Sequence, residues 1–179
     1  MAFRSRSRVV RARAPRKRAI WVSIPFAAVA YTETTGVQLL LTPADWEAQF
    51  GGTGMEHAVL RAIVGEIYLM QTTVSTTAGV PTFFGIFKSD VAVTAAPAFT
   101  VAGMSTVDWL HTGVVPNTTT VTASTIQAGH GNYVIPIRVK AKRRLTSQDE
   151  IRICAQIGSD AGSPGGTING LLRFLIARD

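Results

Sequence analysis

Residues branched at Cβ dominate the apolar part of this sequence. Valine, isoleucine and threonine together supply 52 of the 179 residues, whereas leucine supplies 10. Branched side chains are restricted about χ1 and pack well on a pleated sheet, so this balance favours β-strands. Hydrophobic residues make up 46% of the chain, enough to bury one core, and the length suits one ordinary domain. The sequence therefore predicts a single, mostly β domain.

The excess positive charge is confined to the N-terminal segment. The formal net charge is +7, yet residues 1–18 hold eight basic residues and no acid, and residues 19–179 hold ten basic and eleven acidic residues. Like charges repel, the segment has no hydrophobic period, and Pro15 interrupts any helix. We therefore predict a disordered basic arm over residues 1–18 and a folded, nearly neutral domain over residues 19–179. The cations of the arm are Arg4, Arg6, Arg8, Arg11, Arg13, Arg16, Lys17 and Arg18.

The composition of the arm favours nucleic acid as its ligand. Seven of its eight cations are arginine, whose planar guanidinium pairs bidentately with phosphate and stacks on bases. A nuclear localisation signal is one alternative, and a membrane-surface or solubility tail is another. The first alternative is compatible with nucleic-acid binding, because a nuclear import receptor and phosphates can both recognise one basic stretch.

Turn-bounded apolar segments predict the folded elements. A first strand begins near Ile20, and Trp21 is expected to lie in the core rather than to stack on a base. Thr42 to Asp45 has the pattern of a helix start, with Pro43 at the first helical position, and Gly51 ends that helix. His57–Met70 is apolar on both parities, which fits a doubly buried strand, with a helix as the alternative. Further strands are predicted at Thr82–Phe87, Thr118–Ile126, Tyr133–Ala141, Ile151–Ile157 and Leu171–Ala177, with a loop at Gly158–Asn169; this spacing is typical of a sandwich or barrel.

One predicted strand carries a cationic face. Within Tyr133–Ala141 the apolar residues alternate with polar ones, so one face is core and the other is basic. The turn after it leads back into Ile151–Ile157, which predicts a hairpin. The basic face can be a solvated surface, a subunit contact or a wall that faces phosphates. The candidate nucleic-acid-binding residues here are Arg138, Lys140, Lys142, Arg143 and Arg144.

Signatures of catalysis and of cofactor binding are missing from the sequence. His57, His111 and His130 lie far apart and lack metal-ligand spacing, and Cys154 is the single cysteine. The chain has no phosphate-binding loop, dinucleotide fingerprint or nucleophile elbow. It also has no run of 18 apolar residues. We therefore expect no enzyme activity, no cofactor, no metal and no membrane insertion.

Short motifs resemble the capsid proteins of small circular single-stranded DNA viruses, within the wider class of coat proteins of small viruses with single-stranded genomes. Near the start, Leu40-Leu41-Thr42-Pro43-Ala44-Asp45 precedes a helix and Val59–Gly65 forms a strand. Later, Asp108-Trp109-Leu110 is followed by Val139–Leu145, a basic strand that ends in Arg-Arg-Leu. The resemblance covers most of residues 1–179.

The resemblance implies an all-β fold, an eight-stranded antiparallel jelly-roll sandwich with one or two short helices. It also implies a capsid protein that assembles with copies of itself into a small icosahedral shell and packages a single-stranded genome, with DNA favoured over RNA, through its arginine-rich arm. The expected location is the virion, with the host nucleus as a place of assembly. Two other classes compete: a cellular nucleic-acid-binding sandwich or barrel with a nuclear localisation tail, and a ligand-binding sandwich of the lectin kind.

Deleting residues 1–18 is expected to leave a folded domain that packages little nucleic acid, because the arm holds eight of the 18 basic residues. Thermal melts of the full and truncated chains, with the ratio of absorbance at 260 and 280 nm for each, would measure this. Unfolding of the truncated chain would contradict the division into arm and domain.

Overall fold

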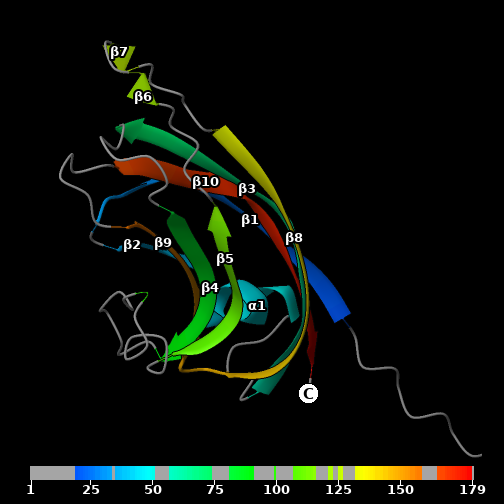
Figure 1. The fold of residues 1–179 in the computed structure, drawn as a ribbon. Coiled ribbons are helices and arrows are strands. Elements are labelled where there is room, and N and C mark those ends of the chain that lie inside the picture. The colour runs from blue at the N-terminus through cyan, green and yellow to red at the C-terminus, as the bar shows by residue number, and fades with distance from the viewer. Residues whose placement is uncertain are drawn as a thin grey trace, which may run out of the picture.

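The computed structural model describes residues 19–33, 35–50, 57–73, 81–90, 99, 107–115, 121–122, 125–126, 132–158 and 165–178. Within these ranges the chain forms two four-stranded antiparallel sheets that pack on each other, together with one short helix (Figure 1). The predicted all-β sandwich is confirmed. The arm, residues 1–18, lies outside the described residues. No helix in the described part of the chain is long and apolar enough to cross a membrane.

The strand order is that of a jelly roll. The first sheet runs β1 (Ala19–Tyr31), β10 (Gly165–Arg178), β3 (His57–Thr73) and β8 (Asn132–Thr146). The second sheet runs β2 (Gly36–Leu41), β9 (Asp149–Ile157), β4 (Thr82–Asp90) and β5 (Asp108–Val115). Most consecutive strands therefore cross between the sheets, as two Greek keys require. Two short strands, β6 (Val121–Thr122) and β7 (Thr125–Ile126), pair only with each other.

The predicted strands at His57–Met70, Thr82–Phe87 and Ile151–Ile157 are confirmed, but the hairpin is wrong. β8 pairs with β3 in the first sheet, whereas β9 lies between β2 and β4 in the second. β9 is buried at seven of its nine positions, so it needs a neighbour on both sides. β8 and β9 are joined by a turn that crosses from one sheet to the other.

The structure differs from the prediction in four further elements. β2 and β5 were not predicted, because neither has a clear period-two pattern. In the predicted strand Thr118–Ile126, the described residues form β6 and β7 instead. The predicted loop Gly158–Asn169 ends early, since β10 begins at Gly165.

The helix α1 (Pro43–Phe50) begins as the sequence predicts. The backbone N–H and the hydroxyl of Thr42 both donate to Oδ2 of Asp45, at 2.7 and 2.8 Å, which caps the helix start. Trp46 is fully buried and fixes the helix to the core. Thr146 and Asp149 repeat the same pair of bonds, at 2.8 and 3.0 Å, and hold the turn between β8 and β9.

Side chains from both sheets fill one core. The inward positions alternate along each strand, and most of the fully buried ones are aliphatic, so burial of apolar surface fixes which face of each strand turns inward. The largest fully buried side chains are Trp46, Phe87, Phe174, Leu41, Leu60, Ile63, Ile67, Leu69, Ile86, Ile137, Leu145 and Ile151.

Two glycines, Gly85 and Gly113, leave room for aromatic rings to pack on the backbone where β4 pairs with β5. The ring of Phe84 covers its cross-strand partner Gly113, and the ring of Trp109 covers Gly85. A Cβ atom at either glycine would collide with that ring. These two positions therefore accept no side chain without repacking of a large aromatic residue.

Gly85→Ala is expected to lower the free energy of unfolding by about 1–3 kcal/mol, because the new methyl group must displace the Trp109 ring. Chemical denaturation would measure the loss. Thr112→Val is the control: Thr112 is the exposed cross-strand partner of Gly85, and this change should cost less than about 0.5 kcal/mol. Equal stabilities of the Gly85→Ala variant and the natural chain would show that the ring does not constrain this site.

Candidate nucleic-acid interface

The two sheets carry opposite charge. The strands of the first sheet contain eight basic residues and one acidic residue, Glu66. The strands of the second sheet contain two basic and four acidic residues. A surface with this excess of one sign attracts polyanions from solution. The face of the first sheet that points away from the core, called here the outer face, is therefore the candidate interface.

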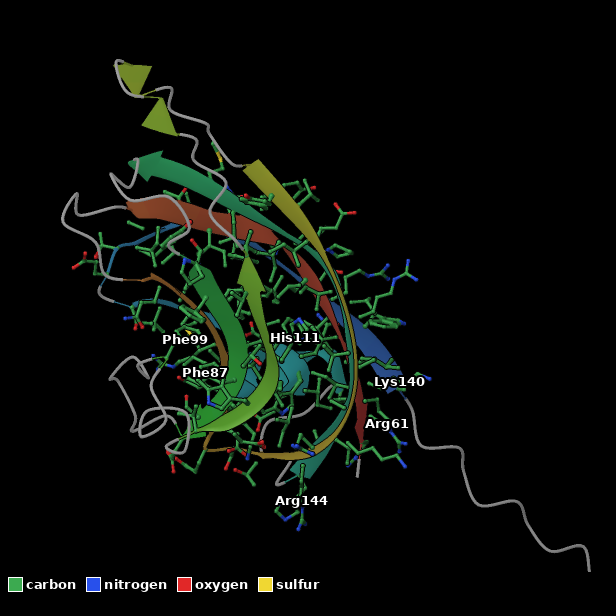
Figure 2. All side chains as sticks on the ribbon, viewed as in Figure 1. Arg61, Phe87, Phe99, His111, Lys140 and Arg144 are labelled. Atoms are coloured by element: carbon green, nitrogen blue, oxygen red, sulfur yellow. The ribbon has the colours of Figure 1, made fainter. Side chains whose placement is uncertain are left out.

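Cross-strand register places these cations together. Arg173 of β10 lies opposite Val64 of β3, which lies opposite Arg138 of β8, and all three face outward. In the next row, Lys140 lies opposite Ala62. Arg61 is exposed at the register shift that follows, and Figure 2 shows it on the same flank of the sheet as Lys140 and Arg144.

The N-terminal end of β1 lies at this same end of the sheet. Ala19, the first described residue, pairs with Ala177, which pairs with Val59, and Val59 pairs with Arg144. Ala19 directly follows Arg18 in the sequence, so the described chain begins next to the basic segment of residues 1–18.

The predicted residues of β8 differ in their surroundings. Arg138, Lys140 and Lys142 are exposed on the outer face. Arg143 instead faces the second sheet, and its Nε donates to both carboxylate oxygens of Asp108 on β5, at 3.2 and 3.0 Å. This exposed ion pair joins the β8 and β5 edges of the sandwich. Arg144 is exposed and makes further contacts of its own. The predicted arm residues lie outside the described part.

Sequence reasoning missed three cations of the first sheet, Arg61, Arg173 and Arg178. At least four residues separate each of them from the nearest basic residue in the sequence, so no local cluster indicates it. The period-two position of Arg173, between the buried Leu172 and Phe174, does indicate an outward side chain. Only the pairing of β10 and β8 with β3 brings Arg61 and Arg173 near Arg138 and Lys140.

The expectation that Trp21 lies in the core is wrong. Val22 and Phe26 take the inward positions of β1, so Trp21 turns outward and is 44% exposed. The Arg173 guanidinium carbon lies 5.2 Å from the centroid of its ring, a cation–π contact. The outer face therefore offers an exposed aromatic ring beside its cations, a pairing that suits single-stranded nucleic acid.

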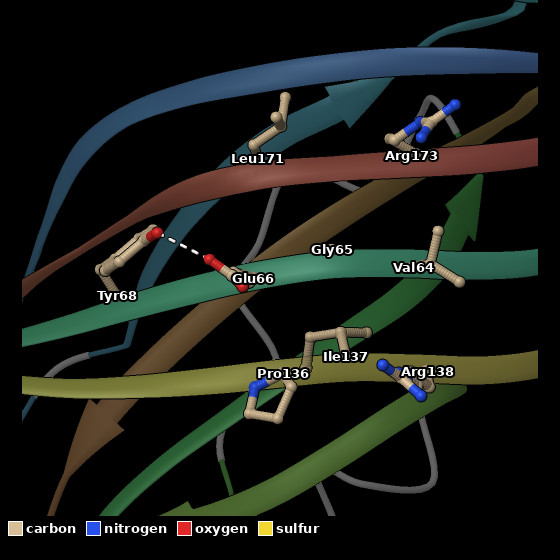
Figure 3. A pocket seen from close by; sticks show the side chains of 9 residues that line it. All are labelled: Val64, Gly65, Glu66, Tyr68, Pro136, Ile137, Arg138, Leu171 and Arg173. Carbon is tan, nitrogen blue, oxygen red and sulfur yellow. Dashed lines mark hydrogen bonds between the residues drawn. The ribbon is translucent and has the colours of Figure 1, made fainter.

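A hollow of about 350 Å³ lies in the outer face between Arg138 and Arg173 (Figure 3). Glu66 and Tyr68 line its other end, and the Tyr68 hydroxyl donates to Oε2 of Glu66 at 2.7 Å. This bond raises the pKa of Tyr68, so the phenol stays protonated. At the base of the hollow, Gly65 has φ of +153°, and a side chain there would collide with the Leu171 carbonyl oxygen.

Aromatic side chains pack together on the outer face of the second sheet. Phe83, Phe87, Phe99 and Trp109 form a chain of ring contacts with centroids 5.3–5.7 Å apart. Gln156 fixes this region, because its Oε1 accepts from the Phe99 N–H at 3.2 Å. The two sides of the sandwich therefore differ in chemistry: the first presents cations, and the second presents aromatic packing.

The remaining candidate groups are arranged as structural residues. Burial raises the pKa of the Cys154 thiol to about 12, and the thiol donates to the Gly85 carbonyl at 3.6 Å. Burial lowers the pKa of His111, whose ring packs on Phe84. His130 lies outside the described residues. No group of three or more His, Cys, Asp or Glu side chains within the described ranges is placed to hold a metal ion.

No protein-family model and no curated protein sequence matches this chain. Among solved structures, a chain from the empty head of turnip yellow mosaic virus aligns with 97% of this chain and 88% of its own length, at 13% identity and a TM-score of 0.34. A chain from maize chlorotic mottle virus aligns over 90% and 93%, at 12% identity and a TM-score of 0.36. A chain from desmodium yellow mottle tymovirus aligns over 96% and 94%, at 11% identity and a TM-score of 0.31. The jelly-roll assignment rests on the strand order and not on these superpositions.

Proposed function

We propose that this chain is a viral coat protein whose copies assemble into a shell and bind single-stranded nucleic acid. The observation that carries the proposal is the division of charge between the sheets. Eight cations and one acid lie in the strands of the first sheet, and the basic arm begins at the end where those cations gather. A protein layer that contacts nucleic acid on one side needs its positive charge on that side.

Binding follows from counterion release. Each phosphate that an arginine or lysine neutralises frees condensed cations, so affinity falls steeply as salt rises. Exposed residues such as Arg138 and Lys140 are placed for such contacts. The ring of Trp21 supplies a stacking surface that accepts any base. Such contacts need no particular base sequence, which suits the packaging of a whole genome.

Exposed apolar residues on both flanks of the sandwich support self-assembly. Val114 on β5 and Val134 on β8 are 58% and 57% exposed, and both strands lie at the same edge. Leu39 on β2 is exposed at the opposite edge. Contact between unlike edges of neighbouring copies is heterologous and closes into rings when the rotation permits.

We further propose a genome type, a shell symmetry and a nuclear import role for this coat protein. The genome is single-stranded DNA, as the motif resemblance implies, and the shell is icosahedral. The arm also serves as a nuclear localisation signal that an import receptor binds. The chain has no catalytic role, no cofactor and no membrane-inserted segment.

A cellular nucleic-acid-binding sandwich with a localisation tail is the second candidate. Such a protein is expected to spread cations over its folded surface. The positions of Arg61 and Arg173 on the outer face favour it as well as the coat protein. Assembly therefore separates the two candidates.

Sedimentation velocity of the full chain at 260 and 280 nm, in low and high salt, tests assembly. A boundary at tens of subunits with strong absorbance at 260 nm is expected for a coat protein that holds nucleic acid. A small oligomer that binds nucleic acid would favour the cellular candidate. A monomer or dimer that binds none, at any salt concentration, would remove both.

Two cations of β8 are expected to contribute differently to binding, because Lys140 lies on the outer face and Arg143 faces the second sheet. Lys140→Gln should reduce the slope of log affinity against log salt by about 0.7 for a single-stranded oligonucleotide, with an unchanged melting temperature. Arg143→Gln should change the slope less, because Asp108 already pairs with Arg143, and should lower stability by about 0.2–1 kcal/mol. Titrations at four salt concentrations and thermal melts measure both. Equal slopes for the two variants would mean that the outer face is not the contact surface.

A further inference from the structure

The hollow in the outer face contains the one acidic residue of the first sheet. Glu66 lies opposite Leu171 of β10 and Pro136 of β8, in the row next to Arg173, Val64 and Arg138. A carboxylate on a surface that binds phosphates weakens that binding unless it has a partner of its own. The Tyr68 hydroxyl donates to one oxygen of this carboxylate, Oε2, and a bound ligand can donate to the other.

The groups around the hollow define what a ligand must carry. Arg138 and Arg173 lie at the two ends of one row, with Val64 between them, and their guanidiniums can bind an anion. The Glu66 carboxylate stands one row further along β3, two residues or about 7 Å away, and it accepts hydrogen bonds only. The ligand must therefore have an anion at one end and a hydrogen-bond donor at the other.

The walls between these groups are apolar. Leu171 and Pro136 stand on either side of Glu66, and the Tyr68 ring is 39% exposed beside it. Figure 3 shows these side chains around one opening, with the Tyr68 hydroxyl directed at Glu66. That bond holds one carboxylate oxygen and orients the group. A flat ring with a polar edge fits between such walls.

We propose that the hollow holds one nucleotide of a bound single strand, with its phosphate on Arg138 and Arg173 and its base edge on Glu66. The contact selects bases that carry an exocyclic amino group. Cytosine N4, adenine N6 and guanine N2 are amino groups that donate to a carboxylate. Thymine has no amino group, and its single N3–H lies between two carbonyl oxygens that repel a carboxylate. This inference rests on the proposed function, and it adds a base preference to a surface that otherwise contacts phosphates.

The test compares labelled oligo-dC and oligo-dT of 20 nucleotides by fluorescence anisotropy. The protein is the full chain, freed of nucleic acid in high salt and assayed at one moderate salt concentration. The natural chain is expected to bind oligo-dC about tenfold more tightly than oligo-dT, within the range of one base contact of this kind.

Glu66→Gln is the informative variant. Glutamine both donates and accepts, so it can pair with thymine O4, and the preference should fall below about twofold. Glu66 is exposed, so the melting temperature should stay the same. Glu47→Gln on α1 is the matched control: it removes the same charge away from the hollow and should keep the tenfold preference. Arg138→Gln should weaken both oligonucleotides equally.

The outcomes separate the inference from the proposed function. Strong, salt-sensitive binding of both oligonucleotides without a preference would overturn the inference and leave the proposed function standing. A preference that survives in Glu66→Gln would also overturn it, because the selecting group would lie elsewhere. Failure of the natural chain to bind either oligonucleotide would overturn the proposed function itself.

Discussion

The pairing of β3 with β10 on one side and with β8 on the other is the constraint on which the outer face depends. Antiparallel register sets Arg173, Val64 and Arg138 in one row, and a slip of any one of these strands by one residue would turn its side chain in the row toward the core. Burial of the inward aliphatic residues on the same strands prevents that slip. Gly65 lets β3 approach the Leu171 carbonyl of β10. The cationic surface is thus fixed by apolar packing on the opposite side of the sheet.

The jelly-roll crossings give the two sides of the sandwich different chemistry. Because β8 and β9 lie in different sheets, the basic residues of β8 and the acidic residues that begin β9 separate onto opposite layers. Asp149 and Glu150 then bind Lys88 and Arg152 within the second sheet, at 3.0 and 2.6 Å. In a hairpin these acids would lie beside the basic residues of β8 and reduce the attraction for phosphate. The crossing keeps the first sheet basic.

Sequence patterns predicted the elements that depend on interactions between residues close together in the chain. The Thr42–Asp45 helix start was predictable because Thr42, which donates both hydrogen bonds, and Asp45, which accepts them, lie three residues apart. The strand over His57–Met70 was predictable from β-branched content. The hairpin failed because period-two alternation in two neighbouring segments does not say whether they pair with each other. The orientation of Trp21 failed because a large apolar side chain suggests the core, whereas strand parity gave the inward positions to Val22 and Phe26.

The sequence by itself determined the β-rich class, the concentration of the excess positive charge in residues 1–18, and the cationic side of β8, because each depends on composition or on residues close together in the chain. Only the tertiary structure decided which cations act together. Arg61, Arg138 and Arg173 come from three strands, and the hollow beside Glu66 exists only where those strands pair. Pairing between distant segments is set by the packing of the whole core, and no single segment encodes it.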